Sequence, residues 1–228
     1  MSTTLPRHKA CNSRKQLAIL IAALPLLMGC SSDSSDWSNL YRIARDSWEK
    51  RGAATTLDQA AAIPYATIGV SLDGEQEQIL VLATDVDGER MWTSSSKIAI
   101  STRNGRIVRT AGLGTDLTAL EPMQPGDTSG IMPGIHIWNA DFANLGIYSA
   151  SIRCVVSPGV PDPISILGAD FQTLRIDESC QSDRLNWNFK NSYWVTQGSG
   201  RVWRAIQHIH PKGPELQIEL LRPPVGND

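Results

Sequence analysis

Long apolar segments are almost absent from this chain: beyond residue 30, no stretch approaches the roughly 18 consecutive apolar residues that indicate a membrane-spanning helix. An excess of basic residues is also missing, with 21 Lys and Arg against 23 Asp and Glu. Proteins that bind nucleic acid cluster basic residues, so this composition argues against a nucleic-acid partner. Only four cysteines occur, and none has the Cys-x-x-Cys spacing of zinc and redox motifs.

Specific catalytic motifs are missing as well. Residues 126–130 read Gly-Asp-Thr-Ser-Gly, which differs from the Gly-Asp-Ser-Gly of trypsin-like proteases. That fold needs a histidine before the serine, whereas His136, His208 and His210 all follow it. Residues 198–200 lack the Gly-Lys-Ser/Thr of a phosphate-binding loop. We therefore predict no catalytic residue and a protein that is not an enzyme.

Two weaker patterns keep other chemistry open. His208 and His210 would face the same side of a strand, as paired metal ligands do, but the remaining ligands are not evident and we predict no metal and no cofactor. A polysaccharide-modifying enzyme needs only two carboxylates at a set distance. Six acidic residues are the candidates: Asp85, Asp87, Glu89, Asp116, Asp141 and Glu178.

The apolar segment near the start is the most informative stretch of the chain. A basic head precedes Leu17–Leu27, which suits a signal peptide and is too short for the roughly 20 residues of a membrane crossing. The tetrapeptide Leu27–Cys30 resembles the lipobox of bacterial lipoproteins. That resemblance implies a signal peptide over residues 1–29 and a mature chain that begins at Cys30, lipidated with a diacylglyceryl group and a further fatty acid such as palmitate. An ordinary secretory signal peptide is the alternative.

The residues that follow Cys30 predict a tether and the membrane in which the protein is anchored. The predicted signal peptide carries four basic and no acidic residues. Its removal therefore leaves 17 basic residues against 23 acidic ones, a formal net charge of −6. Residues 30–36 are a lipidated cysteine and a small, polar segment that reads as a flexible tether. Ser31, where enteric inner-membrane lipoproteins have aspartate, implies anchoring in the outer membrane with the domain facing the periplasm.

Cys154 and Cys180 remain as an even pair in an oxidising compartment, which favours a disulfide. Its loop of about 26 residues would contribute on the order of 3 kcal/mol in the chain-entropy model. Two buried free thiols are the alternative.

The domain over residues 37–224 is predicted to be all-β, a barrel or curled sandwich of about nine strands with one N-terminal helix. Apolar residues at three- and four-residue spacing predict the helix over about 37–50. A period of two predicts the strands, at 65–72, 78–84, 89–93, 97–102, 106–110, 147–156, 172–176, 185–196, 201–209 and 215–221. Asn104-Gly105 is a strong hairpin signal. Residues 112–146 show no sustained period and are predicted to be a long excursion from the sheet.

Aromatic and planar polar residues are dense between Trp187 and His210. Rings beside amide and guanidinium groups are typical of sugar-binding surfaces, and equally of aromatic residues that pack in a β-sheet core. Core packing is the preferred interpretation for most of them. The candidates for contact with a glycan or a partner protein are Trp194, Trp203, Arg204 and Gln207.

Several short segments, in order, resemble the YjbF/GfcB family of bacterial outer-membrane lipoproteins over about residues 36–224. They are Ile63–Ala66, Thr102–Arg106, Thr110–Leu113, Asn191–Val195, Val202–Arg204 with Gln207, His210–Pro211 and Leu221–Pro223. Where the family has an acidic residue after the Tyr-Trp-Val segment, this chain has Thr196.

The resemblance implies a lipid-anchored, β-rich protein that assists exopolysaccharide or capsule production or export without catalysis. Its expected partners are the outer membrane, polysaccharide-export proteins and the glycan itself. A polysaccharide-modifying enzyme and a purely structural envelope lipoprotein are the alternatives.

Overall fold

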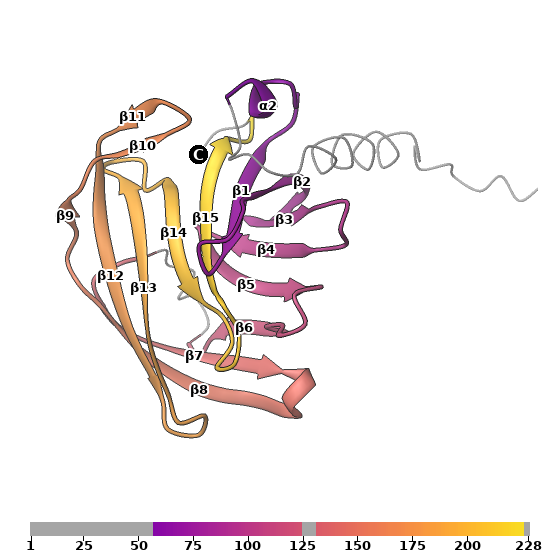
Figure 1. Ribbon diagram of the computed structural model, residues 1–228. Helices are drawn as coiled ribbons and strands as arrows, with labels where there is room; N and C mark the ends of the chain where they lie inside the picture. Colours follow the sequence, from indigo (N-terminus) through magenta and orange to yellow (C-terminus); the bar gives the residue numbers. More distant parts are fainter. Residues whose placement is uncertain (1–56, 125–130, 226–228) are drawn as a thin grey trace, which may run out of the picture. The chain divides into compact units, whose positions relative to one another are not determined.

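The computed structural model describes residues 57–124 and 131–225 (Figure 1). The predicted signal peptide, Cys30, the tether and the predicted helix over 37–50 lie outside these residues. The described helices are α2 (Leu57–Ala61) and the short 3-10 helix η1 (Ala143–Leu145). Neither is long and apolar enough to cross a membrane.

The described residues form one antiparallel sheet of thirteen strands and a separate hairpin. Twelve strands follow one another across the sheet. In spatial order they are β5 (Arg106–Ala111), β4 (Ala99–Arg103), β3 (Glu89–Thr93), β2 (Gln78–Val86), β1 (Thr67–Leu72), β15 (Glu215–Arg222), β14 (Val202–His208), β13 (Trp187–Thr196), β12 (Thr173–Ser182), β8 (Ile147–Val156), β7 (Gly134–Phe142) and β6 (Ala119–Pro122). The thirteenth, β9 (Val160–Pro161), pairs with β12, and β10 (Ile164–Ile166) pairs with β11 (Ala169–Phe171).

The sheet curls until its two edge strands, β5 and β6, come close to each other (Figure 1). The backbone N–H of Thr110 donates to the carbonyl of Leu117 at 2.8 Å, and Arg109 Nε donates to the carbonyl of Thr118 at 3.2 Å. The predicted all-β, barrel-like class is therefore confirmed, while the predicted number of strands, about nine, is too low.

Short turns set the register of the hairpins. Asn104 and Gly105 have φ values of 51° and 81°, and Asp87 and Gly88 have 51° and 79°. Two consecutive residues with positive φ match the twist of antiparallel strands, which is why Asn-Gly and Asp-Gly favour two-residue hairpins. The hairpin predicted at Asn104-Gly105 is confirmed as β4–β5.

The prediction for residues 112–146 is wrong, because β6 and β7 lie there. In β7 the inward side chains Trp138, Ala140 and Phe142 are buried. The outward positions Ile135 and Ile137 are also apolar, although 61% and 38% exposed. The apolar side chains change from the outer to the inner face between Ile137 and Trp138, which interrupts the alternation that identifies a half-buried strand.

The core fills the interior of the curled sheet. Its largest cluster combines residues from all parts of the domain, such as Ile68, Leu80, Trp92, Ile100, Phe142, Ile152 and Leu216. Because these strands are far apart in the sequence, the interior is assembled only when the sheet curls. Polar groups buried in this interior need hydrogen-bonding partners or counter-ions within it.

Candidate functional site

The aromatic segment predicted as a contact surface divides between the two faces of the sheet. On β13, Asn191 and Tyr193 point inward and are 4% and 0% exposed, while the alternating residue Trp194 is half-buried on the outer face. On β14, Gln207 points inward and is 2% exposed, whereas Arg204 is half-buried. The sequence alone could not assign these faces, because both carry aromatic and polar side chains.

The inward-facing polar residues surround a buried ion pair between Arg106 on β5 and Glu178 on β12. Both guanidinium Nη atoms donate to the two carboxylate oxygens of Glu178 at 2.8 Å. Asn191 Nδ2 donates to Glu178 Oε2 at 2.9 Å, and the Tyr193 hydroxyl donates to the same oxygen at 3.2 Å. The Arg106 guanidinium also lies 4.4 Å from the ring centroid of Trp138. A bidentate, hydrogen-bonded arrangement of this kind is what a buried ion pair requires.

The protonation states follow from this geometry. Burial by itself raises the pKa of Glu178, but the Arg106 charge and the hydrogen bonds to the carboxylate outweigh burial and hold the pKa below its ordinary value. Burial raises the pKa of the Tyr193 hydroxyl; Arg106 partly offsets this effect and Glu178 reinforces it. Glu178 is therefore an ionised acceptor and Tyr193 a protonated donor.

Gln207 extends the same network across the interior and is not a surface residue. Its Oε1 accepts from the backbone N–H of Ile107 at 3.0 Å and lies 3.3 Å from the Tyr193 hydroxyl, whose single proton it shares with Glu178 Oε2. Its Nε2 donates to the carbonyl of Gly105 at 2.9 Å. These bonds connect β14 to the start of β5. The structure thus corrects the prediction that Gln207 contacts a glycan or partner: its side chain joins two sides of the barrel.

Trp194 and Arg204 lie together on the outer face, and their side-chain N–H groups donate hydrogen bonds to neighbouring segments. Trp194 Nε1 donates to Asp162 Oδ2 at 3.0 Å. Arg204 Nε donates to Glu219 Oε1 at 2.6 Å, and Nη2 donates to the carbonyl of Ser165 at 3.1 Å. The Arg204 guanidinium lies 5.7 Å from the Trp194 ring centroid. The structure brings these two candidates together as a contact between the sheet and residues 162–165.

Trp203 occupies a different place. Its ring stacks on Phe171 of β11, with centroids 4.0 Å apart, and its Nε1 donates to the Thr196 hydroxyl at 2.6 Å. Thr196 is the residue that departs from the acidic residue of the resembling family, and here its hydroxyl serves as an acceptor. Trp203 also lines the cavity described next, which Trp194 and Arg204 do not.

A cavity of about 300 Å³ lies between the β4–β5 turn and the β13–β14 turn; we call it the turn cavity. Its wall combines apolar side chains, polar side chains and glycines from β1, β3, β4, β14, β15 and the two turns. The lining residues are Ile68, Arg90, Trp92, Thr102, Asn104, Gly105, Ser199, Gly200, Arg201, Val202, Trp203, Ala205, Ile218 and Leu220. Two guanidinium groups and no carboxylate belong to this lining, although the domain as a whole is acidic.

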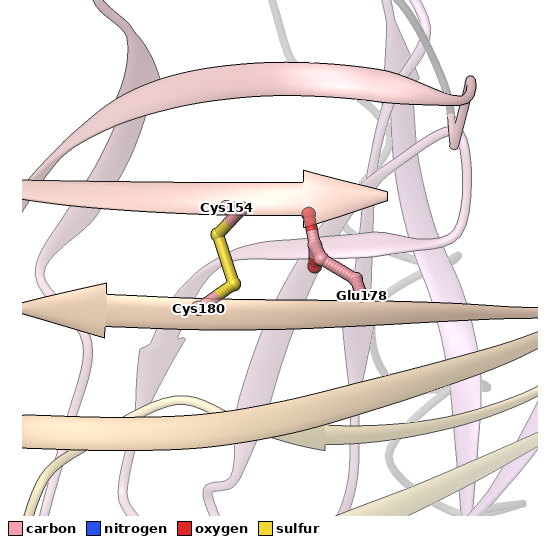
Figure 2. Close-up of side chains that lie close together, drawn as sticks. All are labelled: Cys154, Glu178 and Cys180. Carbon is pink, nitrogen blue, oxygen red and sulfur yellow. A yellow bond between two sulfur atoms is a disulfide. The ribbon is translucent and has the colours of Figure 1, made fainter. Parts of the chain in front are cut away.

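The expected disulfide is present: Cys154 on β8 is bonded to Cys180 on β12, with Glu178 beside it (Figure 2). These three residues are the one grouping of potential metal ligands in the described part of the chain. The two sulfur atoms form a disulfide, and the Glu178 carboxylate is hydrogen-bonded to Arg106, so these groups already have partners. We conclude that the grouping is structural in its oxidised form.

The histidines considered as metal ligands do not converge in the described residues. The buried ring of His210 packs edge-on against Phe142 at 5.3 Å, and its Nδ1 accepts from the backbone N–H of Lys212 at 3.0 Å. Burial and the Lys212 charge lower the pKa of His210, consistent with a neutral, accepting ring. His208 Nδ1 is bonded to the carbonyl of Lys190, and His136 Nε2 to that of Met132.

Most of the carboxylates considered for catalysis have structural partners. Asp85 and Glu89 form ion pairs with Arg90 and Arg103, each at 2.9 Å. Asp116 accepts from the Thr110 hydroxyl and from backbone N–H groups at Gly112 and Leu113. Asp141 accepts from the backbone N–H of Ser149. Asp87 occupies a tight turn, and Glu178 belongs to the buried network described above.

Known proteins resemble this chain in sequence and in fold. Over residues 38–221 it matches the family described as "Group 4 capsule polysaccharide lipoprotein gfcB, YjbF". It is 24% identical to the uncharacterized lipoprotein YjbF of Escherichia coli K12 over 208 residues, which cover 86% of this chain and 92% of the relative. It is 22% identical to the uncharacterized lipoprotein GfcB of the same organism over 217 residues, 92% of this chain and 99% of the relative.

The crystal structure of the hypothetical lipoprotein YmcC from Escherichia coli K12 shares the fold, with a TM-score of 0.62 and 20% identity. The match covers 81% of this chain and 96% of that protein. Neither sequence relative carries a name that states an enzymatic activity. With its matching segments spread over nearly the whole domain, this chain belongs to the YjbF/GfcB family of capsule polysaccharide lipoproteins.

Proposed function

We propose that this protein is an accessory lipoprotein of polysaccharide production or export, anchored in the outer membrane through lipid on Cys30 and not an enzyme. The observation that carries the proposal is the family match over residues 38–221, which names a capsule polysaccharide lipoprotein. The lipobox-like Leu27–Cys30 supplies the anchor, and Ser31 favours the outer membrane over the inner one. Three fatty chains on one cysteine would hold such a protein firmly, because one chain alone binds membranes only marginally.

The structure supports a binding role over catalysis. Among the six carboxylates, Glu178 lies at the centre of a closed hydrogen-bond network and four others hold turns or pair with arginines. A barrel-like domain with a cavity beside two of its hairpin turns suits a protein that binds the glycan or a neighbouring export protein. Its tether of a few residues would keep these partners close to the inner leaflet of the outer membrane.

A deletion strain tests this function. Surface polysaccharide is quantified in the wild type, in the deletion strain and in the same strain carrying the gene on a plasmid. We expect the deletion to lower exported polysaccharide and the plasmid to restore it, while an unrelated outer-membrane protein is assembled normally. Normal export in the deletion strain contradicts the proposal, and envelope defects without a polysaccharide defect favour the purely structural alternative.

The enzymatic alternative is tested in vitro. The full-length protein in phospholipid nanodiscs is incubated with polysaccharide from its own host, and the chain-length distribution and acetyl content of the polymer are measured. We expect both to stay unchanged. A change that depends on the protein would contradict the non-enzymatic proposal.

A further inference from the structure

We propose that the turn cavity binds one acidic sugar residue of an anionic polysaccharide. The inference rests on the proposed function, since that function brings the glycan to the protein. It adds a binding site and a chemical class of ligand. The cavity has the size of one sugar ring, a wall of mixed polar and apolar groups, and two arginines.

The size and position of the cavity suit one sugar ring within a chain. Its volume of about 300 Å³ is at the small end of the range for ligand pockets, about 300–1,000 Å³. Asn104, Ser199 and Gly200 line it and are exposed, so the cavity opens to solvent beside the two turns. A polymer could pass across this opening while one residue of it enters.

The wall presents an aromatic ring held in a fixed orientation. Trp203 is fixed by its stacking on Phe171 and by its bond to Thr196. Trp92 also lines the cavity; it is 3% exposed and donates its N–H to the Thr102 hydroxyl at 2.9 Å, so the rest of its indole is apolar. The C–H face of a sugar packs on such rings, and rings that are already fixed lose little entropy on binding.

The charge at the cavity favours an anion. Arg90 and Arg201 both line it, and no aspartate or glutamate does. Arg201 lies over the Trp203 ring, with its guanidinium carbon 5.6 Å from the centroid, which brings a cation next to the stacking surface. Asp85 pairs with Arg90, but both side chains are about one-third exposed, and exposed pairs of this kind are weak. A guanidinium and a carboxylate can form two parallel hydrogen bonds, so a uronic acid fits this wall.

The same wall disfavours a lipid tail. Thr102, Asn104, Ser199 and turn glycines line the cavity together with apolar side chains. A hydrocarbon chain would bury these polar groups without bonding to them, which is costly. A sugar with one apolar face and a polar edge matches the mixture.

Calorimetric titration with a matched pair of ligands tests the proposal. The full-length protein in phospholipid nanodiscs is titrated with oligogalacturonate and with the same oligomer as its neutral methyl ester. We expect the acid to bind at least about tenfold more tightly than the ester, and its affinity to fall as salt is raised. Equal affinity for acid and ester overturns the proposal, as does a medium-chain fatty acid that binds while the oligogalacturonate does not.

Two matched pairs of variants assign the binding to this cavity. Arg201→Gln should weaken oligogalacturonate binding about tenfold, while Arg175→Gln, which removes a charge from the outer face of β12, should leave it unchanged. Trp203→Leu should weaken binding, and Trp194→Leu, outside the cavity, should not. Thermal unfolding of each variant shows whether weaker binding comes from the loss of a ligand contact or from a less stable fold. Equal effects within either pair, at equal thermal stability, overturn the assignment to the turn cavity.

The result of the ligand titration can be separated from the result of the deletion experiment. If deletion abolishes polysaccharide export but the protein shows no preference for the acidic oligomer, the ligand inference fails while the proposed function stands. If the acidic oligomer binds but deletion leaves export normal, the proposed function fails and the cavity remains a sugar-binding site.

Discussion

At the scale of single residues, the buried pair of Arg106 and Glu178 dominates the interior. The two residues are 72 positions apart and come from strands on opposite sides of the curled sheet. Removing charges from water is costly, and the cost is offset here by bidentate geometry and by Asn191 and Tyr193. Arg106, Asn191, Tyr193 and Gln207 all lie in segments that carry the family resemblance, so the network gives those segments a physical role.

The first prediction concerns the loss of one partner. Glu178→Gln should lower the free energy of unfolding by about 3–5 kcal/mol, because it leaves the Arg106 charge buried without its counter-ion. Urea denaturation measures this value. Glu89→Gln is the matched control: it removes a carboxylate that pairs with Arg103 and Arg109 at the solvent-accessible side of the sheet and should cost about 1 kcal/mol. Equal losses in the two variants would show that the buried pair is no stronger than a surface one.

The second prediction concerns pH. The folded pKa of Glu178 lies below its ordinary value of 4.5, so the folded protein binds this proton less readily than the unfolded chain. Its stabilisation is therefore present above about pH 4.5 and is lost as the pH falls through the folded pKa. The wild type should lose stability on acidification more steeply than Glu178→Gln does, as measured by urea midpoints from neutral pH downward. Parallel pH profiles would contradict the assignment.

The sequence pattern favours Gln207 as a surface contact and Glu178 as one of several candidate carboxylates, whereas both side chains are buried. One signal was available for Glu178: it alternates with Ile176 and Cys180, so all three point to the same side of a strand. Its partner Arg106 could not be predicted, because no local pattern relates residue 178 to residue 106. For the same reason, the sequence alone could not reveal a cavity whose wall comes from five strands and two turns.

At the scale of elements, local patterns predict strands that show alternation or a short apolar run between turn residues, as β2 does. The strand at residues 89–93 and the Asn104-Gly105 hairpin were predicted correctly, since alternation and turn chemistry are local. β7 was missed because its apolar side chains change face between Ile137 and Trp138, and β9, β10 and β11 because two or three residues are too few to show a period. Sheet order depends on how the strands meet after curling, so it was not predictable from these patterns.

The third prediction concerns the β4–β5 turn, which borders the turn cavity. A Cβ added to Gly105 would lie 2.4 Å from a methyl carbon of Val202, and the residue has a φ of 81°. Gly105→Ala should therefore cost about 1–3 kcal/mol from overpacking, in addition to the backbone strain. Gly88→Ala is the matched control, with a φ of 79° and no heavy atom within 4 Å of the added Cβ.

Thermal unfolding of the two variants separates the effects. Backbone strain is common to both, so the difference between them reports the contact with β14. A Gly105→Ala protein as stable as Gly88→Ala would show that the turn does not pack closely on Val202.

At the scale of the whole molecule, the protein has a barrel-like domain, and the sequence before it predicts a lipid attachment site at Cys30. A disulfide joins β8 to β12, and with a separation of 26 residues it stabilises the domain by on the order of 3 kcal/mol in the chain-entropy model. Such a domain suits the oxidising envelope of a bacterium. Its family connects it with capsule polysaccharide, and Cys30 is the residue expected to hold it at the membrane.

The central claim is that this protein acts in polysaccharide export from a lipid anchor on Cys30. The most direct measurement is the amount of exported polysaccharide in a deletion strain that expresses Cys30→Ser, compared with the same strain expressing Cys11→Ser, whose altered residue lies in the expected leader. We predict that Cys30→Ser is lost from the outer-membrane fraction and fails to restore export, while Cys11→Ser restores it fully. Full restoration of export by Cys30→Ser would contradict the claim.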